Sequence, residues 1–494
     1  MLSQVSATRV EISGSDTDLE KIQKQLQYQD LKVDFEISKH KKAYWYVNKF
    51  GQEQWQEKLD ELKASRTKSL FFQEKDGTFW TYSGLTKNLL KSLPHISFKN
   101  TTKYPEPKSI PWHKQPTKIP RPYQKEIISR LIEARHGGVE AATGCGKTLC
   151  IMLLTKHYGL KTVVMTPSIS IAKQMHKEFL HHFGPKYVGK YGDGKKEYKK
   201  LFTVAISASL ANLEPEDEAW KELSKASVFI ADESHLCPAQ TLARVCFGVL
   251  AEAPYRFFFS GTQMRGDGLD LLLEAITGDI VFRFTVQEGV DQGYLARPRF
   301  QMFSLRSDSV SQSDDPNAMT REHLFYSPRV NKLAASIANR VVSEMGRSVL
   351  ILIEEMEQFS CLLPYLRHSV RFAHGGCTKE NRDKVPKEYQ DKPDVAELVE
   401  AYNAGEFPIL IGTSCVGTGT DFQGVGVVIY LQGGKPEVQI KQSVGRGTRL
   451  VEGKTDFFFI DFDVYDCHTT HRHAVARREI YEEIYPDSIQ EIRP

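Results

Sequence analysis

The chain has 494 residues, of which 40% are hydrophobic and 26% are charged, so it can bury two or three cores of ordinary domain size. No run approaches the roughly 18 apolar residues of a membrane span, and the first residues lack a basic-then-apolar leader. We therefore expect a cytoplasmic protein without a membrane partner. Eight cysteines, none in a C-x-x-C pair, favour reduced thiols over a disulfide or zinc framework.

The first 105 residues predict a small α+β accessory domain. From residue 39 to residue 120 there are 16 Lys and Arg against 7 Asp and Glu, together with four of the five tryptophans. Basic charge among aromatics suits contacts to nucleic-acid phosphates with stacking side chains. Alternatively, the aromatics form the core of a β-rich domain and the lysines are solvated. Residues 70–72 and 78–82, around Asp76-Gly77, predict a hairpin.

The remainder of the chain predicts two α/β domains, at residues 106–296 and 297–494. Residues 101–120 are proline-rich and are expected to form a linker. Short apolar runs then alternate with helical segments, which is typical of parallel sheets covered on both faces. A polar stretch at residues 305–320 predicts a long connection between the sheets. The expected strands are Thr162–Met165, Phe202–Ile206, Val228–Ala231 and Arg256–Phe259 in the first domain, and Ser348–Ile353, Phe407–Gly412, Val425–Tyr430 and Phe457–Ile460 in the second.

A phosphate-binding loop is predicted at residues 141–148, between a strand ending near Val139 and a helix at residues 149–154. Its glycines allow backbone N–H groups to surround phosphate oxygens at a helix N-terminus. Lys147 is expected to reach the β- and γ-phosphates of ATP. Ala141 replaces the usual first glycine, and an ordinary glycine-rich turn is the alternative. The expected nucleotide ligands here are Thr143, Gly144, Cys145, Gly146, Lys147 and Thr148, with Thr148 also on Mg²⁺.

Two acidic residues follow the predicted strand Val228–Ala231, at the edge where α/β folds bind ligands. Asp232 is expected to hold Mg²⁺, and Glu233 is expected to orient and polarise the attacking water. A pair of acids at a strand end is usually a solvated turn. Its position about 85 residues after the phosphate loop favours the catalytic interpretation.

Seven segments, named at the end of this paragraph, resemble in type and in order along the chain the motif set of superfamily 2 helicases. They span roughly residues 119–463. Within that superfamily the chain is similar to the branch of XPB, RadD and UvsW, through residues 265–268 and 289–298. The resemblance implies two tandem RecA-like domains, with ATP bound by the first. Gly261-Thr262-Gln263 departs from the Ala-Thr-Pro that is frequent in the family. The seven segments are residues 121–124, 141–148, 166–168, 232–235, 260–262, 417–421 and 442–449.

These segments also supply the remaining nucleotide-site candidates. The amide of Gln124 can meet the adenine edge, although a solvated helix-start glutamine is the alternative. Arg446 and Arg449 are spaced to act as arginine fingers, and a surface ion pair is the alternative for either one alone. The resemblance adds Arg121 and Gln442, assigns Gly419 and Asp421 to the nucleotide, and gives His235, Ser260 and Thr262 a coupling role.

Nucleic acid is expected to lie across both sheets, held mainly through phosphates. Hydroxyls and exposed N–H groups gather at predicted strand ends, although each segment alone could be a simple turn. The DNA-binding candidates are Thr166, Pro167, Ser207, Ser209, His374, Gly375, Thr413 and Ser414.

The resemblance implies an ATP-dependent DNA helicase or translocase that remodels branched DNA in recombination, repair or replication. We expect ATP and Mg²⁺ as cofactors, duplex or branched DNA as partner, and a monomer or weak oligomer of phage or bacterial origin. Two alternatives stay open. One is the motor of a restriction or defence assembly, and the other is an RNA-dependent ATPase or clamp that does not unwind.

Overall fold

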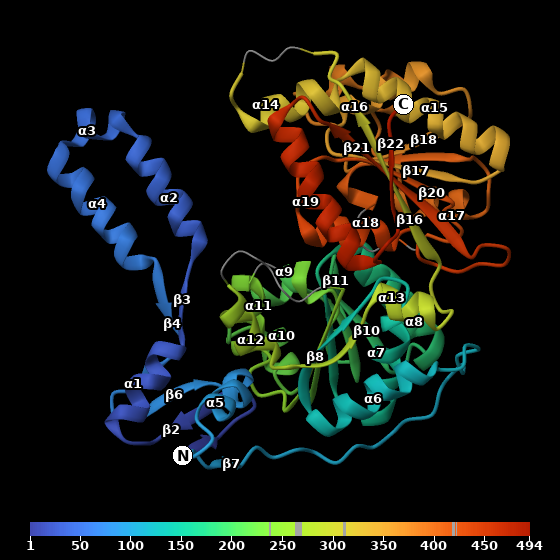
Figure 1. The fold of residues 1–494 in the computed structure, drawn as a ribbon. Coiled ribbons are helices and arrows are strands. Elements are labelled where there is room, and N and C mark those ends of the chain that lie inside the picture. The colour runs from blue at the N-terminus through green and yellow to red at the C-terminus, as the bar shows by residue number, and fades with distance from the viewer. Residues whose placement is uncertain (237–238, 262–268, 310–312, 417–419, 421) are drawn as a thin grey trace. The chain divides into compact units, whose positions relative to one another are not determined.

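The structure is a computed structural model that describes residues 1–236, 239–261, 269–309, 313–416, 420 and 422–494 (Figure 1). The chain divides into two compact units. The first unit holds residues 1–140 and 147–283, and the second holds residues 141–146 and 284–494. The phosphate loop at residues 141–146 is thus grouped with the second unit.

The N-terminal domain is a mixed sheet with two helices, in the strand order β5-β6-β2-β1-β7. Leu2, Val10 and Ile12 alternate with more exposed neighbours, as expected of a sheet with one buried face. The predicted hairpin around Asp76-Gly77 is confirmed, because β5 and β6 pair antiparallel. The elements are β1 (Leu2–Gln4), β2 (Arg9–Ile12), α1 (Asp16–Gln25), β5 (Phe72–Gln73), β6 (Phe79–Tyr82), α5 (Thr86–Ser92) and β7 (Phe98–Asn100).

A helical arm, residues 30–66, interrupts this domain and was not predicted. A two-stranded ribbon, β3 (Gln27–Gln29) with β4 (Thr67–Ser69), opens into α2 (Leu31–Lys42), α3 (Tyr44–Phe50) and α4 (Gln52–Ser65). In Figure 1, α2 and α4 run side by side, and α3 joins them at the end remote from the ribbon. Val33 and Leu59 are buried between them. The arm thus has a small core of its own.

The N-terminal domain is fastened to the rest of the first unit by apolar contacts. The ring of Tyr82 stacks on Phe247, with centroids 3.7 Å apart. Asn88 donates a hydrogen bond of 3.1 Å to Glu274 Oε1. Helix α12 (Asp270–Thr277) contributes Leu271, Leu272 and Ala275 to the hydrophobic cluster that forms the N-terminal core.

The proline-rich segment at residues 101–120 was expected to be a linker. It lies along the first unit and is held there by hydrogen bonds and ring stacking, and we call it the strap. Lys108 N donates to Tyr158 O at 2.7 Å, and His113 N donates to His182 O at 2.8 Å. Trp112 stacks on Phe183, with centroids 4.9 Å apart. Prolines exclude regular structure here without excluding backbone hydrogen bonds from the residues between them.

Within the described ranges, the rest of the first unit is an eight-stranded sheet in the order β11-β10-β12-β9-β13-β14-β8-β15. The strands from β10 to β8 run parallel, and their buried apolar runs confirm the expected sheet. The strands are β8 (His136–Ala141), β9 (Thr162–Thr166), β10 (Val188–Gly192), β11 (Lys195–Lys196), β12 (Phe202–Ile206), β13 (Val228–Ala231), β14 (Tyr255–Ser260) and β15 (Ile280–Phe284). The helices are α6 (Pro122–Ala134), α7 (Lys147–Tyr158), α8 (Ile169–Phe183), α9 (Ser207–Ala211), α10 (Glu218–Leu223), α11 (Ala239–Phe247) and α12 (Asp270–Thr277).

In the part of the second unit that the structure describes, the strands form a seven-stranded parallel sheet in the order β18-β19-β17-β20-β21-β16-β22. Its strands are β16 (Arg297–Leu305), β17 (Val349–Ile353), β18 (Val370–Ala373), β19 (Ile409–Gly412), β20 (Val427–Leu431), β21 (Asp456–Val464) and β22 (Ile489–Ile492). The helices are α13 (Val286–Asp291), α14 (Pro316–Thr320), α15 (Pro328–Met345), α16 (Glu357–Leu362), α17 (Val395–Asn403), α18 (Glu437–Gly445) and α19 (His468–Ile484).

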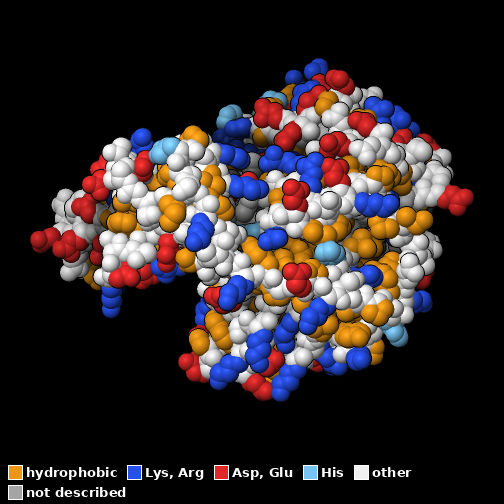
Figure 2. Space-filling view, turned by 90° about the horizontal axis from the view of Figure 1, so that it is seen from below, with side chains coloured by type: hydrophobic (Ala, Val, Ile, Leu, Met, Phe, Trp, Pro, Cys, Tyr) orange, Lys and Arg blue, Asp and Glu red, His pale blue; other side chains and the backbone are white. Residues whose placement is uncertain are grey.

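Charged groups of both signs share the surface. On the face drawn in Figure 2, Lys and Arg side chains lie interspersed with Asp and Glu, in keeping with a net charge of only +3. Among the described residues, no helix combines the length and the hydropathy that crossing a lipid bilayer requires.

Candidate nucleotide and nucleic-acid site

The phosphate loop has a backbone conformation with positive φ angles at two of its glycines. It leaves β8 at Ala141 and enters α7 at Lys147. Gly144 and Gly146 have φ values of +90° and +75°, a region that side chains with a Cβ rarely adopt. Cys145 is buried and its N–H donates to Ala142 O at 3.3 Å. The turn thus presents backbone at the N-terminus of α7, a geometry that suits an anion.

Lys147 and the two acidic residues after β13 come together in the first unit. Lys147 Nζ lies 3.1 Å from Glu233 Oε1, and the two side chains are only 10% and 21% exposed. Asp232 is tied to the neighbouring strand β9, because its N–H donates to Met165 O at 2.9 Å. The cation expected to bind phosphates and the carboxylate expected to orient water are therefore adjacent, an arrangement that suits in-line phosphoryl transfer.

Glu233 has a strained backbone, with φ at +46°. A residue with a side chain rarely adopts this conformation, and such strain tends to mark functional sites. The Glu233 N–H donates to Asp232 Oδ1 at 3.0 Å. The turn therefore separates the two carboxylates, so that Asp232 stays buried while Glu233 meets Lys147.

Asp232 and Thr148 have the chemistry that Mg²⁺ requires. Burial, and then the charge of Glu233, raise the pKa of Asp232 to about 7. A bound divalent cation offsets that cost and favours the ionised carboxylate. Thr148 lies beside Lys147 in the first turn of α7 and offers a hydroxyl oxygen. The described residues contain no cluster of three or more His, Cys, Asp or Glu side chains suited to a metal, and Mg²⁺ at a phosphate site commonly takes only one or two carboxylates.

His235 extends the network from the catalytic candidates to the end of β14. Its Nδ1 lies 3.4 Å from Glu233 Oε2 and 2.7 Å from the hydroxyl of Ser260. Both His235 and Ser260 are buried. Four side chains, from Lys147 through Glu233 and His235 to Ser260, thus form one continuous polar path.

The two candidates at the start of α6, Arg121 and Gln124, have hydrogen-bond partners within that segment. Gln124 is buried, and its Oε1 accepts a hydrogen bond of 2.9 Å from the N–H of Arg121. Arg121 Nη1 donates to the hydroxyl of Tyr123 at 3.0 Å. Gln124 therefore caps the helix with its carbonyl, which fixes the orientation of its amide.

The finger candidates lie at the end of α18 in the second unit. Arg446 is 7% exposed, and its Nη1 donates to Thr420 O at 2.6 Å. Arg449 and Gln442 are partly buried. Between the two arginines, Thr448 Oγ1 donates to Thr143 O of the phosphate loop at 3.1 Å. The segment that carries both arginines therefore contacts the loop directly.

The carboxyl edge of the first sheet brings three of the DNA-binding candidates together. Thr166 ends β9 and pairs in register with Ile206, so Ser207 follows beside it. A Cβ on Gly192 at the end of β10 would lie 2.7 Å from Ser209 Oγ, which shows how closely these turns approach. Pro167 follows Thr166 in the turn before α8, where the N–H of Ile171 donates to the hydroxyl of Ser168 at 3.3 Å.

Thr166 and Ser207 are 0% and 4% exposed, and the corresponding edge of the second sheet likewise has two buried candidates. His374 and Thr413 follow the paired strands β18 and β19 and are 1% and 8% exposed. One ring nitrogen of His374 lies 2.9 Å from Tyr389 O, and the other accepts from Gly376 N at 3.1 Å. The imidazole of His374 therefore stabilises the loop that follows β18. Of the candidates at this edge, Gly375 and Ser414 are exposed.

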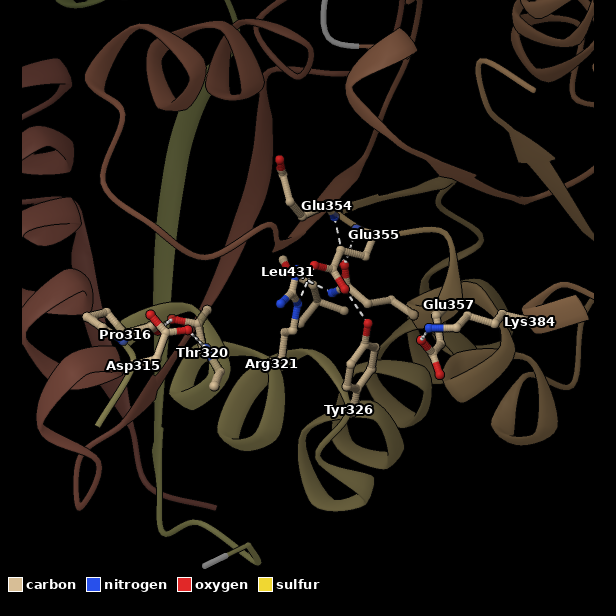
Figure 3. Close-up of polar contacts among 12 residues, drawn as sticks. Asp315, Pro316, Thr320, Arg321, Tyr326, Glu354, Glu355, Glu357, Lys384 and Leu431 are labelled. Atoms are coloured by element: carbon tan, nitrogen blue, oxygen red, sulfur yellow. Dashed lines mark hydrogen bonds and ion pairs between the residues drawn. The ribbon is translucent and has the colours of Figure 1, made fainter. Parts of the chain in front are cut away.

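A polar cluster at the end of β17 was not predicted (Figure 3). Glu355 accepts a hydrogen bond from the hydroxyl of Tyr326 and forms an ion pair of 2.6 Å with Arg321 Nε. These contacts tie the π-helical turn Arg321–Phe325 to the sheet edge. In the sequence, two adjacent acids, Glu354 and Glu355, are the one feature that could have indicated this cluster. Three further candidates, Thr262, Gly419 and Asp421, lie outside the described residues.

Two protein families match the chain. Residues 117–265 match the family described as "Type III restriction enzyme, res subunit", and residues 331–451 match "Helicase conserved C-terminal domain". Together they cover more than half of the chain. The chain belongs to the superfamily 2 helicases. Membership confirms the predicted pair of RecA-like domains and implies ATP hydrolysis and nucleic-acid binding.

Similar proteins span phage, archaeal and eukaryotic helicases. "Probable helicase D10" of Escherichia phage T5 is 25% identical over 347 residues, covering 69% of this helicase and 71% of that protein. "DNA 3'-5' translocase XPB2" of Sulfurisphaera tokodaii is 22% identical over 360 residues, covering 66% and 77%. The structure of Dbp5 from S. cerevisiae bound to RNA and ADP BeF3 has a TM-score of 0.52 at 13% identity, covering 76% and 90%, and this likeness shows the fold alone.

Proposed function

We propose that this helicase is an ATP-driven DNA translocase that remodels branched DNA, by regressing forks, migrating junctions or unwinding R-loops and D-loops. The observation that carries the proposal is the path Lys147–Glu233–His235–Ser260, formed by four polar side chains. It joins the phosphate end of the nucleotide site to β14, so a change at the γ-phosphate has a physical route into the sheet.

The nucleotide site assigns a separate task to each residue. Lys147 binds the β- and γ-phosphates, and Glu233 orients the attacking water and accepts its proton. Thr148 and Asp232 hold Mg²⁺, which supplies charge neutralisation when bound. Arg446 and Arg449 add charge stabilisation at the γ-phosphate.

The remaining nucleotide contacts orient the base, the ribose and the loop. The amide of Gln124, fixed by the helix cap, reads the adenine edge, and Arg121 supports it. Gln442 belongs to the finger segment on α18, and Asp421 and Gly419 are assigned to the ribose side. Thr262 completes the coupling path beyond Ser260.

The DNA track follows the carboxyl edges of both sheets. Its contacts are to phosphates and therefore tolerate any sequence. Support for DNA comes from the printed names of two relatives, a phage helicase and a DNA translocase. The assigned contacts are Thr166, Pro167, Ser207 and Ser209 on the first sheet, and His374, Gly375, Thr413 and Ser414 on the second.

Two other functions have specific support. The family matched by residues 117–265 takes its name from a restriction enzyme subunit, which favours the motor of a restriction assembly. Relatives named RNA helicases, at 23% identity, favour an RNA-dependent ATPase. Both share the nucleotide chemistry proposed above and differ in the polymer and in the partner proteins.

ATPase turnover compared across four nucleic acids tests the proposal. We expect the largest stimulation with a four-way junction or fork, an intermediate one with linear duplex, and the smallest with single-stranded RNA. Greater stimulation by RNA than by any DNA overturns the proposal in favour of the RNA-dependent ATPase. Equal stimulation by linear duplex and junction, with translocation along the duplex, favours the restriction motor.

A further inference from the structure

The tryptophans of the N-terminal region differ sharply in their surroundings. Trp55 stacks on His40, with centroids 5.4 Å apart, and its Nε1 donates to His40 O at 3.2 Å. Trp80 stacks on Phe72 within the sheet at 4.4 Å. Trp112 lies on Phe183, as described above. Each of these three rings packs against a neighbouring ring. Trp45 lies on α3 and has 61% of its surface exposed.

Trp45 shares the end of the arm with a second exposed aromatic ring. Phe50, the last residue of α3, is 42% exposed. We call residues 37–52 the arm tip, since they comprise the end of α2, all of α3 and the first residue of α4. Val33 and Leu59 are buried in the arm and Trp55 stacks on His40, whereas Trp45 and Phe50 keep much of their surface exposed. Large apolar rings gathered on a surface commonly mark an interaction site.

Charge is segregated along the arm in a way that identifies the partner. The arm tip has four lysines, Lys39, Lys41, Lys42 and Lys49, all exposed, and no Asp or Glu. The rest of residues 30–66 has seven acids against four Lys and Arg. A positive field is therefore confined to the end that carries the exposed rings. Such a combination matches a polyanion that also offers flat apolar surfaces, which is nucleic acid with unstacked bases.

We propose that the arm tip binds DNA at a branch point, with its lysines on the phosphates and Trp45 and Phe50 stacked on unpaired bases. This inference rests on the proposed function, because a translocase that acts on branched DNA meets such bases where strands separate. Linear duplex keeps its bases stacked and offers only phosphates to the same tip. The tip therefore recognises DNA structure rather than DNA sequence.

A double variant, Trp45→Ala with Phe50→Ala, tests the proposal in the full-length chain. The probe is a fork that carries 2-aminopurine at the first unpaired position, compared with a linear duplex of equal length. Loss of base stacking should reduce the preference for the fork over the duplex about tenfold. It should also abolish the change in 2-aminopurine fluorescence seen on binding of the wild type. Trp45→Phe, which keeps a flat ring, should restore most of the preference.

Phe35→Ala is the matched control. Phe35 is even more exposed, at 73%, but it lies on α2 between Asp34 and Glu36, outside the arm tip. Its removal should leave the fork preference unchanged. Replacing the four tip lysines with Gln should flatten the dependence of fork affinity on salt concentration, because fewer counterions are released.

The outcomes separate this proposal from the proposed function. If DNA stimulates the wild-type ATPase but the double variant keeps the full fork preference and fluorescence change, the tip proposal is overturned and the translocase remains. That result also arises if the tip binds another protein. If no DNA stimulates the wild-type ATPase, the proposed function itself fails. A Phe35→Ala effect equal to that of the double variant likewise overturns the assignment to the tip.

Discussion

Lys147 Nζ and Glu233 Oε1 are held 3.1 Å apart as a partly buried ion pair. Under the proposed function, we expect the phosphates of ATP to compete with Glu233 for this cation, so that binding of nucleotide releases the carboxylate toward water. The pair would then keep the proposed water-activating group occupied until its substrate arrives. This relationship gives separate expectations for the two residues.

Lys147→Ala should weaken ATP binding and abolish turnover, since it removes the flexible cation of the phosphate loop. Glu233→Gln should retain ATP binding while turnover falls about 100- to 10,000-fold, the range typical of a lost general base. Fluorescent-nucleotide titration and phosphate release measured on the same preparations distinguish the two. Near-normal turnover in either purified variant would show that the site is misassigned.

Arg446→Ala and Arg449→Ala should lower DNA-stimulated turnover by about 10³- to 10⁵-fold, the usual value of an arginine finger, with DNA affinity in the absence of nucleotide preserved. Lys substitutions should rescue poorly, because a point charge cannot replace a planar, two-pronged donor. Arg472→Ala on the exposed side of α19 is the control. Weakened DNA binding with unchanged basal turnover would identify the two arginines as phosphate ligands instead.

Lys454 predicts a pH dependence of stability. Burial lowers its pKa from 10.5 to about 8, and its Nζ donates to Gly447 O at 2.6 Å and Arg449 O at 3.0 Å. Between about pH 8 and 10.5 the unfolded chain binds this proton and the folded chain does not. The free energy of unfolding should therefore rise with pH across that window, and the contribution of Lys454 should be constant below about pH 8, where both states bind the proton.

Urea unfolding of wild type and Lys454→Met at pH 7.5, 8.5 and 9.5 measures this effect. The stability advantage of the wild type should grow with pH, while Lys435→Met, at an exposed position, should follow the wild type. A constant difference between wild type and Lys454→Met across the series contradicts the prediction.

The stack of Tyr82 on Phe247 predicts that the N-terminal domain stabilises the first helicase domain. Tyr82→Ala should lower the free energy of unfolding by about 1–2 kcal/mol, whereas Tyr82→Phe keeps the ring and should have little effect. Deletion of residues 1–105 should lower the melting temperature further, since it uncovers Leu271, Leu272 and Ala275. A truncated chain that melts with the intact one would show that these contacts contribute nothing.

Sequence patterns predicted the two parallel sheets well. Runs such as Val228–Ala231 are short, wholly apolar and followed by polar turns, and every residue of this strand is buried. The edge positions followed from the same logic, because parallel strands deliver Thr166 and Asp232 to one side. The pairing of Lys147 with Glu233 depends on the positive φ of Glu233, which no residue pattern indicates.

The arm, and the backbone contacts that hold residues 101–120, were not predicted, for a different reason. Helices α2 and α4 expose most of their polar surface and enclose only a few buried residues, so their periodicity is weak. The strap at residues 101–120 is held by backbone groups, such as Lys108 N on Tyr158 O, and backbone contacts leave no trace in side-chain patterns. Likewise, an acidic pair at residues 354–355 gave no hint of Arg321 and Tyr326.

The arm has the dimensions of a lever. Helix α4 has 14 residues, so its far end lies about 20 Å from the ribbon of β3 and β4 at about 1.5 Å per residue. A rotation of about 10° at that ribbon would displace Trp45 by about 3.5 Å, close to the ~3.4 Å rise of one nucleotide in a DNA strand. Two strands of three residues each form the pivot. If the tip stacks on unpaired bases as proposed, a twist of that size at the ribbon would carry a stacked ring from one base to the next.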